Sequence, residues 1–409
     1  MHKVLHMLNY LGNGGSEKYI YSLAKRLHGK TCMFYIAYSQ DGPGRSAFEE
    51  LGISLLPLRM DSPFDIKAAV RLREICRSLS IETVHTHFLR ENYIGAISKI
   101  IGNDVRLINT RHMLFDNSRR VAFANRIFTR FNYRIIAVSR HVQDSLIREG
   151  IRKDRIAMIY NGIDPDEWSN HGKSSNTGED GSSDIRSSIC KDDGSGGWEQ
   201  PVESSFRKNH GIEDDELLIT SVSRFSPEKG HGFIIEVIRY FNENLQKYCQ
   251  PNVKYRFILA GDGPLLGDIK EKAKEYGLEC SIVFTGYTDN VKELLNSSDI
   301  FIAHSESEAF GIAILEAMAS GLPVITTACG GTAEIVNEDF GNGLLADFGD
   351  IKGYADNIAL LVNDESLRRK YAENGQSVVR DHFSLDKTAD ETYNLYRNTE
   401  RGKGDRDDR

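Results

Sequence analysis

Two glutamates, Glu308 and Glu316, stand eight residues apart in a segment whose spacing suggests chemistry. Glu308 precedes a helical pattern by one or two residues, and Glu316 lies inside that pattern. Because a helix has about 3.6 residues per turn, both carboxylates can face one crevice and bind sugar hydroxyls. The N–H groups of Phe310, Gly311 and Ile312 would form a helix N-terminus that suits phosphate. The segment predicts a sugar-nucleotide site; capping by Glu308 and a structural Glu316 is the alternative.

Two turns also carry groups that can hold phosphate. Arg224 and Lys229 lie five residues apart after an apolar run, where together they can neutralise a diphosphate. Two ordinary surface cations in a solvated loop are the alternative. Gly14 and Gly15 precede a helical pattern, so an anion can approach their backbone closely. A plain turn with Ser16 as N-cap fits this second segment equally well.

Histidine offers a further kind of site. His85 and His87 are two residues apart and therefore share one face of an expected strand, where they could bind a metal ion. A third ligand at suitable spacing is missing from the sequence pattern. We therefore expect a structural or crevice-lining role for both residues and no metal site.

These residues need elements that bring them together. Short apolar runs alternate with helical periodicity, which is typical of parallel sheets covered by helices. In the first half we expect strands at 3–8, 31–38, 53–58, 81–87, 105–111 and 134–139. In the second half we expect them at 217–223, 254–260, 281–286, 299–304 and 323–327. The sequence thus predicts two Rossmann-like α/β domains with a ligand crevice between the carboxyl ends of their strands.

The predicted domain boundaries follow from breaks in this pattern. We expect an N-terminal domain at 1–165, a linker at 166–214, a second domain at 215–384, a C-terminal helix at 385–401 that packs back towards the first domain, and a frayed tail at 402–409. Within the linker, residues 169–205 contain 10 serines and 6 glycines but few apolar residues. Such a composition predicts a disordered insertion.

Composition narrows the class of protein. A chain of 409 residues fits two domains at ~100–200 residues each, and no apolar run approaches the ~18 residues of a membrane span. The N-terminus lacks the pattern of a signal peptide. The six cysteines are scattered, without a C-x-x-C pair. These features predict a reduced protein of the cytoplasm.

Charge is distributed unevenly. Residues 1–165 carry 25 basic and 15 acidic side chains, whereas the remainder carries 26 and 44, which gives +10 and −18. A helix over 118–132 would place Phe123, Ile127 and Phe131 in one stripe beside arginines. This pattern predicts binding of an anionic membrane surface or a phosphate-bearing acceptor. The arginines concerned are Arg119, Arg120, Arg126 and Arg130. The alternative is a stripe that packs on the sheet beneath solvated arginines; no nucleic-acid partner is expected.

Six motifs, in one order, resemble those of glycosyltransferase family 4, the retaining sugar-nucleotide enzymes with the two-domain GT-B fold. They are Gly14-Gly15-Ser16-Glu17, Asn161-Gly162-Ile163-Asp164, Arg224 with Lys229, Gly261-Asp262-Gly263-Pro264, Phe284-Thr285-Gly286-Tyr287, and Glu308 with Glu316. The resemblance covers nearly the whole chain except 169–205 and the tail. It implies a GT-B fold, with the two Rossmann-like domains facing each other across a cleft.

The resemblance also implies roles for single residues. Arg224 and Lys229 would bind the donor diphosphate, and Glu316 would bind the ribose. Glu308 would hold the transferring sugar, and His112, after the strand at 105–111, aligns with the family histidine near the reacting centre. The remaining donor-binding positions would be Gly14, Gly15, Gly261, Thr285, Tyr287, Phe310, Gly311 and Ile312.

As a whole, the resemblance implies a retaining, metal-independent transferase without a cofactor. It would move a sugar from a UDP- or GDP-linked donor to a glycan or lipid-linked acceptor, in cell-surface polysaccharide or glycolipid synthesis. Together with the arginine-rich stretch, this predicts peripheral association with the inner face of the membrane. Asp164 and Asp166 mimic an Asp-x-Asp metal motif but belong to the Asn161 motif, so we expect no ion there. Two alternatives remain: a sugar-nucleotide epimerase or hydrolase, and a non-catalytic nucleotide-sugar-binding protein.

Overall fold

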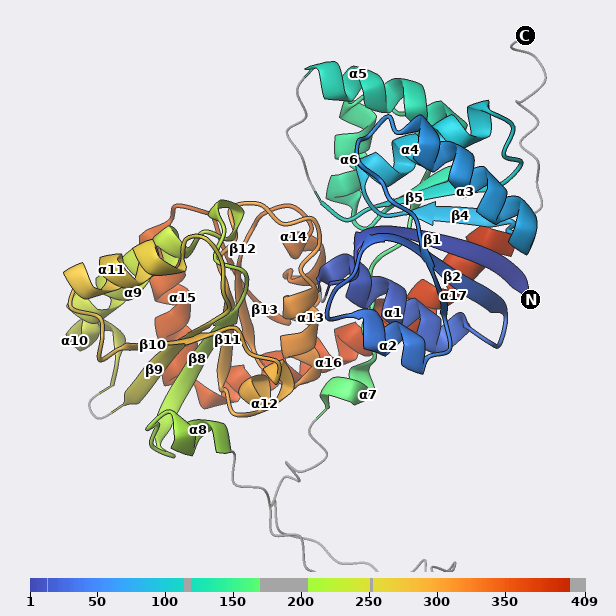
Figure 1. The fold of residues 1–409 in the computed structure, drawn as a ribbon. Helices are drawn as coiled ribbons and strands as arrows, with labels where there is room; N and C mark the ends of the chain where they lie inside the picture. Colours follow the sequence, from blue (N-terminus) through green and yellow to red (C-terminus); the bar gives the residue numbers. More distant parts are fainter. Residues whose placement is uncertain (13, 114–118, 170–204, 251–252, 398–409) are drawn as a thin grey trace, which may run out of the picture.

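Two parallel β-sheets form the frame of the protein (Figure 1), seen in a computed structural model that describes residues 1–12, 14–113, 119–169, 205–250 and 253–397. The first sheet has the strand order β3-β2-β1-β4-β5-β6-β7. Its strands are β1 (His2–Tyr10), β2 (Cys32–Gln40), β3 (Ser54–Pro57), β4 (Thr83–Thr86), β5 (Arg106–Arg111), β6 (Arg134–Ala137) and β7 (Ile156–Met158).

The second sheet repeats this arrangement with the order β10-β9-β8-β11-β12-β13. Its strands are β8 (Glu216–Val222), β9 (Lys254–Ala260), β10 (Ile282–Gly286), β11 (Ile300–Ala303), β12 (Val324–Thr327) and β13 (Gly343–Ala346). In both sheets the order reverses beside the first strand, as in doubly wound folds, where ligands bind at the carboxyl ends of the strands. The predicted pair of Rossmann-like domains is confirmed.

Helices connect the strands and bury their apolar stripes against the sheets. In the first half they are α1 (Gly15–Leu27), α2 (Arg45–Glu50), α3 (Ile66–Leu79), α4 (Leu89–Ile100), α5 (Arg119–Phe128), α6 (Arg140–Arg148) and α7 (Pro165–Trp168). In the second half they are α8 (Ser205–Asn209), α9 (His231–Glu243), α10 (Leu245–Tyr248), α11 (Leu266–Glu275), α12 (Val291–Asn296), α13 (Ile312–Ala319), α14 (Thr332–Ile335), α15 (Ile351–Asn363), α16 (Glu365–His382) and α17 (Leu385–Arg397).

Two expected helix starts are wrong. Ser16 is not the N-cap of α1, because Gly14 occupies that position and the buried Ser16 hydroxyl donates to the Glu17 carboxylate at 2.8 Å. The helix after Glu308 begins at Ile312, four residues later, rather than one or two. Gly311 has a φ of 111°, which no helical residue adopts, so the intervening residues form a loop.

The segment between the domains is partly built into the second domain. Helix α7 packs against α13 and α16. After the insertion, Phe206 and Ile212 join Leu218 in one apolar cluster, so the core of this domain includes residues before 215. The expected disorder of 169–205 concerns 170–204, which lie outside the described residues, as does the tail from 398.

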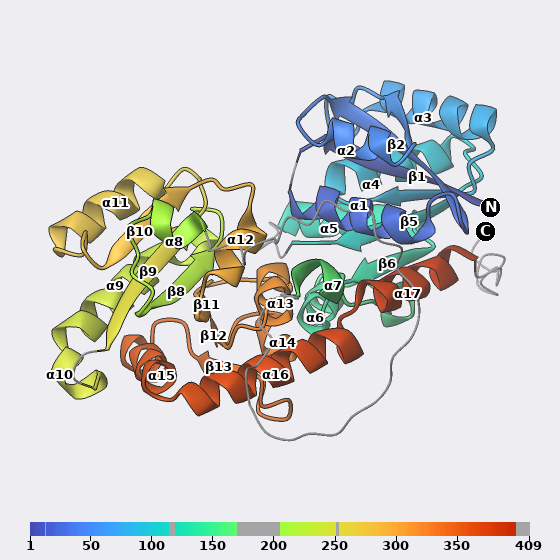
Figure 2. The same ribbon diagram turned by 90° about the horizontal axis from the view of Figure 1, so that it is seen from below.

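The chain crosses between the domains twice, and the two crossings lie side by side. The Ile163 N–H donates to the Phe383 carbonyl at 3.1 Å, and the Leu385 N–H donates to the Ile163 carbonyl at 2.7 Å. Figure 2 shows α16 and α17 running from the second domain beneath the first. There Ala389 and Tyr396 of α17 join the core formed by β1, β2 and α1.

Candidate active site

Two adjoining cavities occupy the cleft where the strand ends of the two domains face each other. One has a volume of about 500 Å³ and contains residues of both domains, including His112 and Glu308. The other has a volume of about 730 Å³ and extends towards Tyr287. Glu17 of the first domain and Arg224 of the second line both cavities. The predicted crevice is therefore present, and its two walls come from different domains.

The turn after β8 places two cations at this cleft. Arg224 is exposed and lines both cavities, whereas Lys229 ends a 3-10 turn (Pro227–Lys229) and lines the smaller one. Gly230, which follows, has a φ of 68°, and a Cβ there would lie 2.2 Å from the His304 carbonyl oxygen. Only glycine lets the turn pack this closely against the end of β11.

A buried histidine fixes the position of that turn. His304 Nδ1 lies 2.7 Å from the Lys229 carbonyl oxygen, and its Nε2 lies 3.0 Å from the Ser221 hydroxyl. Because a carbonyl only accepts, Nδ1 carries the proton and Nε2 accepts from Ser221. Burial lowers the pKa of His304 to about 4, which keeps it neutral. His304 had no predicted role, although its place at the end of an expected strand, four residues before Glu308, pointed to the site.

Lys229 and Glu308 form an ion pair on the floor of the cleft. Lys229 Nζ lies 2.5 Å from Glu308 Oε2, and both side chains are about one-fifth exposed, at 23% and 21%. The Glu308 backbone carbonyl accepts from the Gly331 N–H at 3.0 Å. The two residues expected to hold the diphosphate and the sugar are therefore neighbours, and each balances the charge of the other.

The loop after Glu308 lines the smaller cavity with backbone. Phe310, Gly311 and Ile312 all contribute to its wall, and α13 starts at Ile312. The unpaired N–H groups of a helix start attract anions. The three residues thus lie in one cavity wall, and their binding of the donor stays a prediction.

Glu316 lies on α13 and lines neither cavity, so its expected contact with the ribose stays a prediction. Since the helix starts only at Ile312, the eight-residue spacing spans a loop and one turn rather than two turns of helix. Glu316 is 8% exposed, and its burial raises the pKa of its carboxyl to about 7, against the opposing influence of Lys18.

Of the remaining expected donor positions, all but Thr285 line one of the two cavities. Gly261 and Tyr287 line the larger cavity, where the Tyr287 side chain is 63% exposed. The Thr285 hydroxyl donates to the Gly286 carbonyl at 3.0 Å, and Thr285 lines neither cavity. Gly14 and Gly15 line the smaller cavity, and a Cβ on Gly15 would meet no atom within 4 Å. The space in front of Gly15 thus opens to the cleft.

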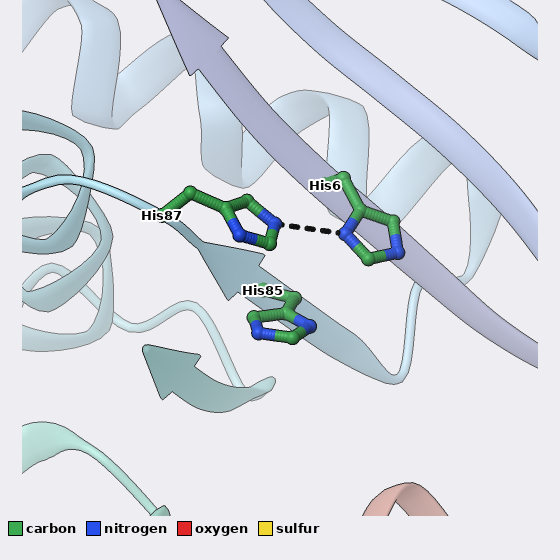
Figure 3. A group of neighbouring side chains, drawn as sticks. All are labelled: His6, His85 and His87. Carbon is green, nitrogen blue, oxygen red and sulfur yellow. Dashed lines mark hydrogen bonds between the residues drawn. The ribbon is translucent and has the colours of Figure 1, made fainter. Parts of the chain in front are cut away.

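His112 stands directly after β5, lines the smaller cavity and contacts further histidines beneath it. Its Nε2 lies 3.0 Å from His87 Nδ1. Figure 3 shows His87 beside His6 and His85, and one nitrogen from each of these three lies within 4.8 Å of the others. His6 is the third member that the sequence analysis missed; it pairs with His85 in the register of β1 and β4.

Hydrogen bonds account for this cluster without an ion. His85 Nδ1 contacts the Tyr396 hydroxyl at 2.6 Å, and its Nε2 contacts the Thr110 hydroxyl at 2.7 Å. His6 Nδ1 and His87 Nε2 lie 3.1 Å apart, a hydrogen-bond distance. An ion bound by all three side chains would have to break these contacts. The expected structural role fits His85, and His87 connects the core to the cleft.

Hydrogen bonds join the domains beside the loop that follows Glu308. The Ser139 hydroxyl, at the start of α6, donates to the Ala309 carbonyl at 2.7 Å. The Glu334 carboxylate accepts from the Arg140 and His141 N–H groups at 2.9 and 3.0 Å, and so caps α6 from the other domain. Tyr160 also donates to Glu334, at 2.8 Å.

The arginine-rich helix α5 presents both charge and apolar surface at the top of the first domain (Figure 1). Phe123 is 66% exposed and Ile127 is 39% exposed, whereas Phe131 packs against the core. The side chains of Arg120, Arg126 and Arg130 are exposed; that of Arg119 and residues 114–118 lie outside what the structure describes. Among the described helices, none combines the length and the apolar character needed to cross a membrane.

Comparison with protein families finds two matching models that follow each other along the chain. Residues 13–167 match the model described as "Glycosyltransferase Family 4", and residues 202–378 match the one described as "Glycosyl transferases group 1". Among curated relatives, N-acetyl-alpha-D-glucosaminyl L-malate synthase of Bacillus anthracis is 25% identical over 355 residues, which cover 85% of this chain and 83% of that protein.

Other similar proteins point the same way. A UDP-Gal:alpha-D-GlcNAc-diphosphoundecaprenol alpha-1,3-galactosyltransferase of Escherichia coli is 23% identical, over 81% of this chain and 79% of that protein. The crystal structure of Anabaena HepE with UDP and glucose superposes with a TM-score of 0.78 at 20% identity, over 96% of this chain and 98% of that one. The fold is the GT-B fold, and the chain belongs to glycosyltransferase family 4.

Proposed function

We propose that this glycosyltransferase moves a sugar from a UDP- or GDP-linked donor to a glycan or lipid-linked acceptor, with retention of configuration and without a metal ion. The observation that carries the proposal is the ion pair of Lys229 and Glu308, beside Arg224, in a cleft of about 500 Å³ that His112 closes from the other domain. Cations, a carboxylate and a helix start meet there, as the phosphate and sugar parts of one ligand require.

The cations support a reaction without a metal. A departing nucleoside diphosphate gains negative charge, and Arg224 and Lys229 would stabilise it in place of a divalent ion. When a diphosphate binds Lys229, the Glu308 carboxylate is released to accept hydrogen bonds from sugar hydroxyls. UDP is the first nucleotide to test, because HepE was solved with UDP and glucose.

Retention is proposed because the described residues that line the cleft include no obvious covalent nucleophile. Glu308 would accept hydrogen bonds from the sugar hydroxyls, and the facing wall offers the imidazole of His112. In a front-side displacement, the bond from the anomeric carbon to the phosphate oxygen breaks, and the bond to the acceptor oxygen forms on the same face. The acceptor proton passes to the leaving phosphate oxygen.

The acceptor side of the proposal depends on α5. The exposed Phe123 and Ile127, next to exposed arginines, support peripheral contact with an anionic membrane, where a lipid-linked acceptor would lie. Among relatives, the E. coli galactosyltransferase is named for a diphosphoundecaprenol acceptor.

The direct test is transfer itself. The protein is incubated with UDP- and GDP-linked hexoses, with EDTA, in the presence and absence of a panel of glycan and polyprenyl-diphosphate acceptors. We expect nucleoside diphosphate release only with an acceptor, and an α-linked product from an α-linked donor by NMR. Full turnover without acceptor indicates an epimerase or hydrolase, and donor binding without any transfer indicates a non-catalytic protein. Activity that requires manganese contradicts metal independence.

A further inference from the structure

A row of three histidines leads from the interior of the first sheet to the cleft. His6 lies on β1, His87 directly follows β4, and His112 directly follows β5. His6 Nδ1 lies 3.1 Å from His87 Nε2, and His87 Nδ1 lies 3.0 Å from His112 Nε2. Both nitrogens of His87 are thus used, and the row ends at His112, which lines the smaller cavity and whose Nδ1 takes no part in the row.

All three imidazoles are neutral. His6 is fully buried and His87 is 2% exposed. Burial lowers the pKa of His6 to about 3 and that of His112 to about 4, and it lowers the pKa of His87 well below its usual range. A neutral imidazole has one N–H and one acceptor nitrogen, so two successive hydrogen bonds fix one common direction for all three rings.

His6 Nε2 decides that direction. This atom is buried and has no hydrogen-bond partner in the described part of the chain. If the row ran inward from His112, Nε2 would be a buried N–H without an acceptor, the rarer and more costly kind of orphan group. If the row runs outward, His6 donates through Nδ1, His87 donates through its own Nδ1, and only an acceptor nitrogen stays unpaired.

His85 supports the row without belonging to it. Its ring stacks on that of His87 with centroids 4.5 Å apart, and its nitrogens are engaged by Tyr396 and Thr110. Figure 3 shows His85 beside the hydrogen bond that joins His6 to His87. The stacked ring of His85 restricts the rotation of the His87 ring. Both hydrogen bonds of the row depend on this fixed orientation.

We propose that His87 is a positioning residue that, together with His6, fixes His112 as a neutral imidazole with its proton on Nδ1, so that His112 donates a hydrogen bond to an oxygen of the bound donor. The proposal rests on the proposed function, because it takes a nucleotide sugar as the ligand of the cleft. Phosphate oxygens only accept hydrogen bonds, and a fixed N–H is complementary to them.

The tautomer can be measured without any activity. Protein labelled with ¹⁵N-histidine gives long-range ¹H–¹⁵N correlations, and the signals of His112 are identified by their loss in His112→Gln. We expect a protonated Nδ1 and an unprotonated Nε2 in the wild type. A proton on Nε2 overturns the proposal, and so does a stoichiometric Zn²⁺ complex that perturbs His6, His85 and His87 together.

Variants of His87 separate positioning from packing. Leu in place of His87 removes both hydrogen bonds, whereas Asn keeps a donor near Nδ1. We expect His87→Leu to lower kcat about three- to tenfold, to leave the Kd for UDP unchanged and to mix the tautomers of His112. His87→Asn should recover most of kcat and the single tautomer.

Equal kcat in His87→Leu and the wild type overturns the proposal, as does a His112 tautomer that His87→Leu leaves unchanged. If the leucine variant does not fold, the wild-type spectrum and His87→Asn still decide. If the wild type binds no nucleotide sugar, the proposed function fails, while the measured tautomer still tests the row of histidines by itself.

Discussion

Arg224 and Lys229, the two residues proposed to bind the diphosphate, differ in their exposure and in their ion pairing. Arg224 is exposed and has no ion-pair partner among the described residues, whereas Lys229 is paired with Glu308. Replacing Arg224 by Ala removes a charge-assisted contact worth about 1.5–3 kcal/mol, so the Kd for UDP should rise roughly 10- to 150-fold by isothermal titration calorimetry. Lys229→Ala should weaken binding more, because it also leaves the Glu308 carboxylate facing the phosphates.

The matched control for Arg224 is Arg380→Ala. Arg380 is an exposed arginine on α16 that lines neither cavity. Arg380→Ala changes the net charge of the protein by the same amount as Arg224→Ala, but away from the cavities. The Kd of this control for UDP should therefore equal that of the wild type. Equal affinities in Arg224→Ala, Lys229→Ala and the control would remove the diphosphate from this turn.

Glu316 should make the stability of the protein depend on pH. Its pKa is raised to about 7 by burial, above the value of about 4.5 of an exposed carboxyl, so the folded state favours the protonated form. The favourable contribution is complete below pH 4.5 and is lost as the pH rises through 7. Glu316→Gln should therefore match the wild type at pH 5 and exceed it at pH 8, on the order of 2–3 kcal/mol in the free energy of unfolding.

Urea denaturation at both pH values measures this difference. Glu373→Gln provides the control, because Glu373 is an exposed carboxyl on α16. Its difference from the wild type should be the same at pH 5 and pH 8. Glu91, whose pKa burial also raises to about 7, contributes equally to all three proteins and cancels from the comparison. If Glu316→Gln and the wild type differ by the same free energy of unfolding at pH 5 and pH 8, the pKa of Glu316 is not raised in the folded state.

At the scale of elements, α5 makes a prediction about membranes. Each arginine near an anionic surface contributes about 1 kcal/mol, and this attraction is screened by salt. Replacing Arg120, Arg126 and Arg130 by Gln should lower the partition coefficient onto phosphatidylglycerol vesicles by about two orders of magnitude at 0.1 M salt. Sedimentation with the vesicles measures this coefficient. The affinity for UDP should stay unchanged.

Three other arginines of the same domain test whether net charge alone is responsible. Arg59, Arg71 and Arg152 have side chains that are 84%, 64% and 76% exposed. Their combined replacement by Gln removes the same charge away from α5. If both triple variants lose vesicle binding equally, α5 is not the contact; if the wild type binds no vesicles, the acceptor is not reached at a membrane.

Most elements were predictable because apolar periodicity marks buried strands and helices. The strand at 254–260 was predicted at its observed bounds, and the others that were predicted differ by one or two residues at one or both ends. The short strands β7 and β13 were missed; each lies at the edge of a sheet, where its pairing with a single neighbour, β6 or β12, defines it. The start of α13 was missed because the positive φ of Gly311 is a property of the folded loop.

The site was predictable where its residues follow the ends of strands, because the carboxyl ends of parallel strands meet at one edge of a sheet. Arg224, Lys229 and Glu308 meet as expected. His6 is 79 residues from His85, and only the register of β1 beside β4 brings them together. Likewise, the contact of Glu334 with the start of α6 depends on how the domains face each other, which no local pattern encodes.

For the molecule as a whole, Glu334 predicts how firmly the domains hold together. Its carboxylate accepts two backbone N–H groups of α6 and the Tyr160 hydroxyl. Hydrogen bonds to a charged group contribute about 1.5–3 kcal/mol. Glu334→Ala should therefore lower Tm and increase the radius of gyration in small-angle X-ray scattering without ligand, and UDP should reverse part of the increase.

Glu338→Ala is the control, since this nearby carboxylate is exposed. Its scattering curve and Tm should match those of the wild type. Unchanged scattering in Glu334→Ala would mean that the double crossing of the chain, rather than this contact, sets the distance between the domains.

Because the chain crosses between the domains twice, the two halves of the protein should stay together even when the chain is cut between the domains. Ala389 and Tyr396 complete the core of the first domain, although they follow the second domain in sequence. A protease cut between residues 170 and 204 would therefore yield two fragments that complete each other. The C-terminal fragment contains α17, which belongs to the core of the first domain, and the N-terminal fragment contains α7, which packs on the second. The halves should co-purify after cleavage and should reassemble when expressed as separate polypeptides, whereas ending the second polypeptide at residue 384 should weaken their association.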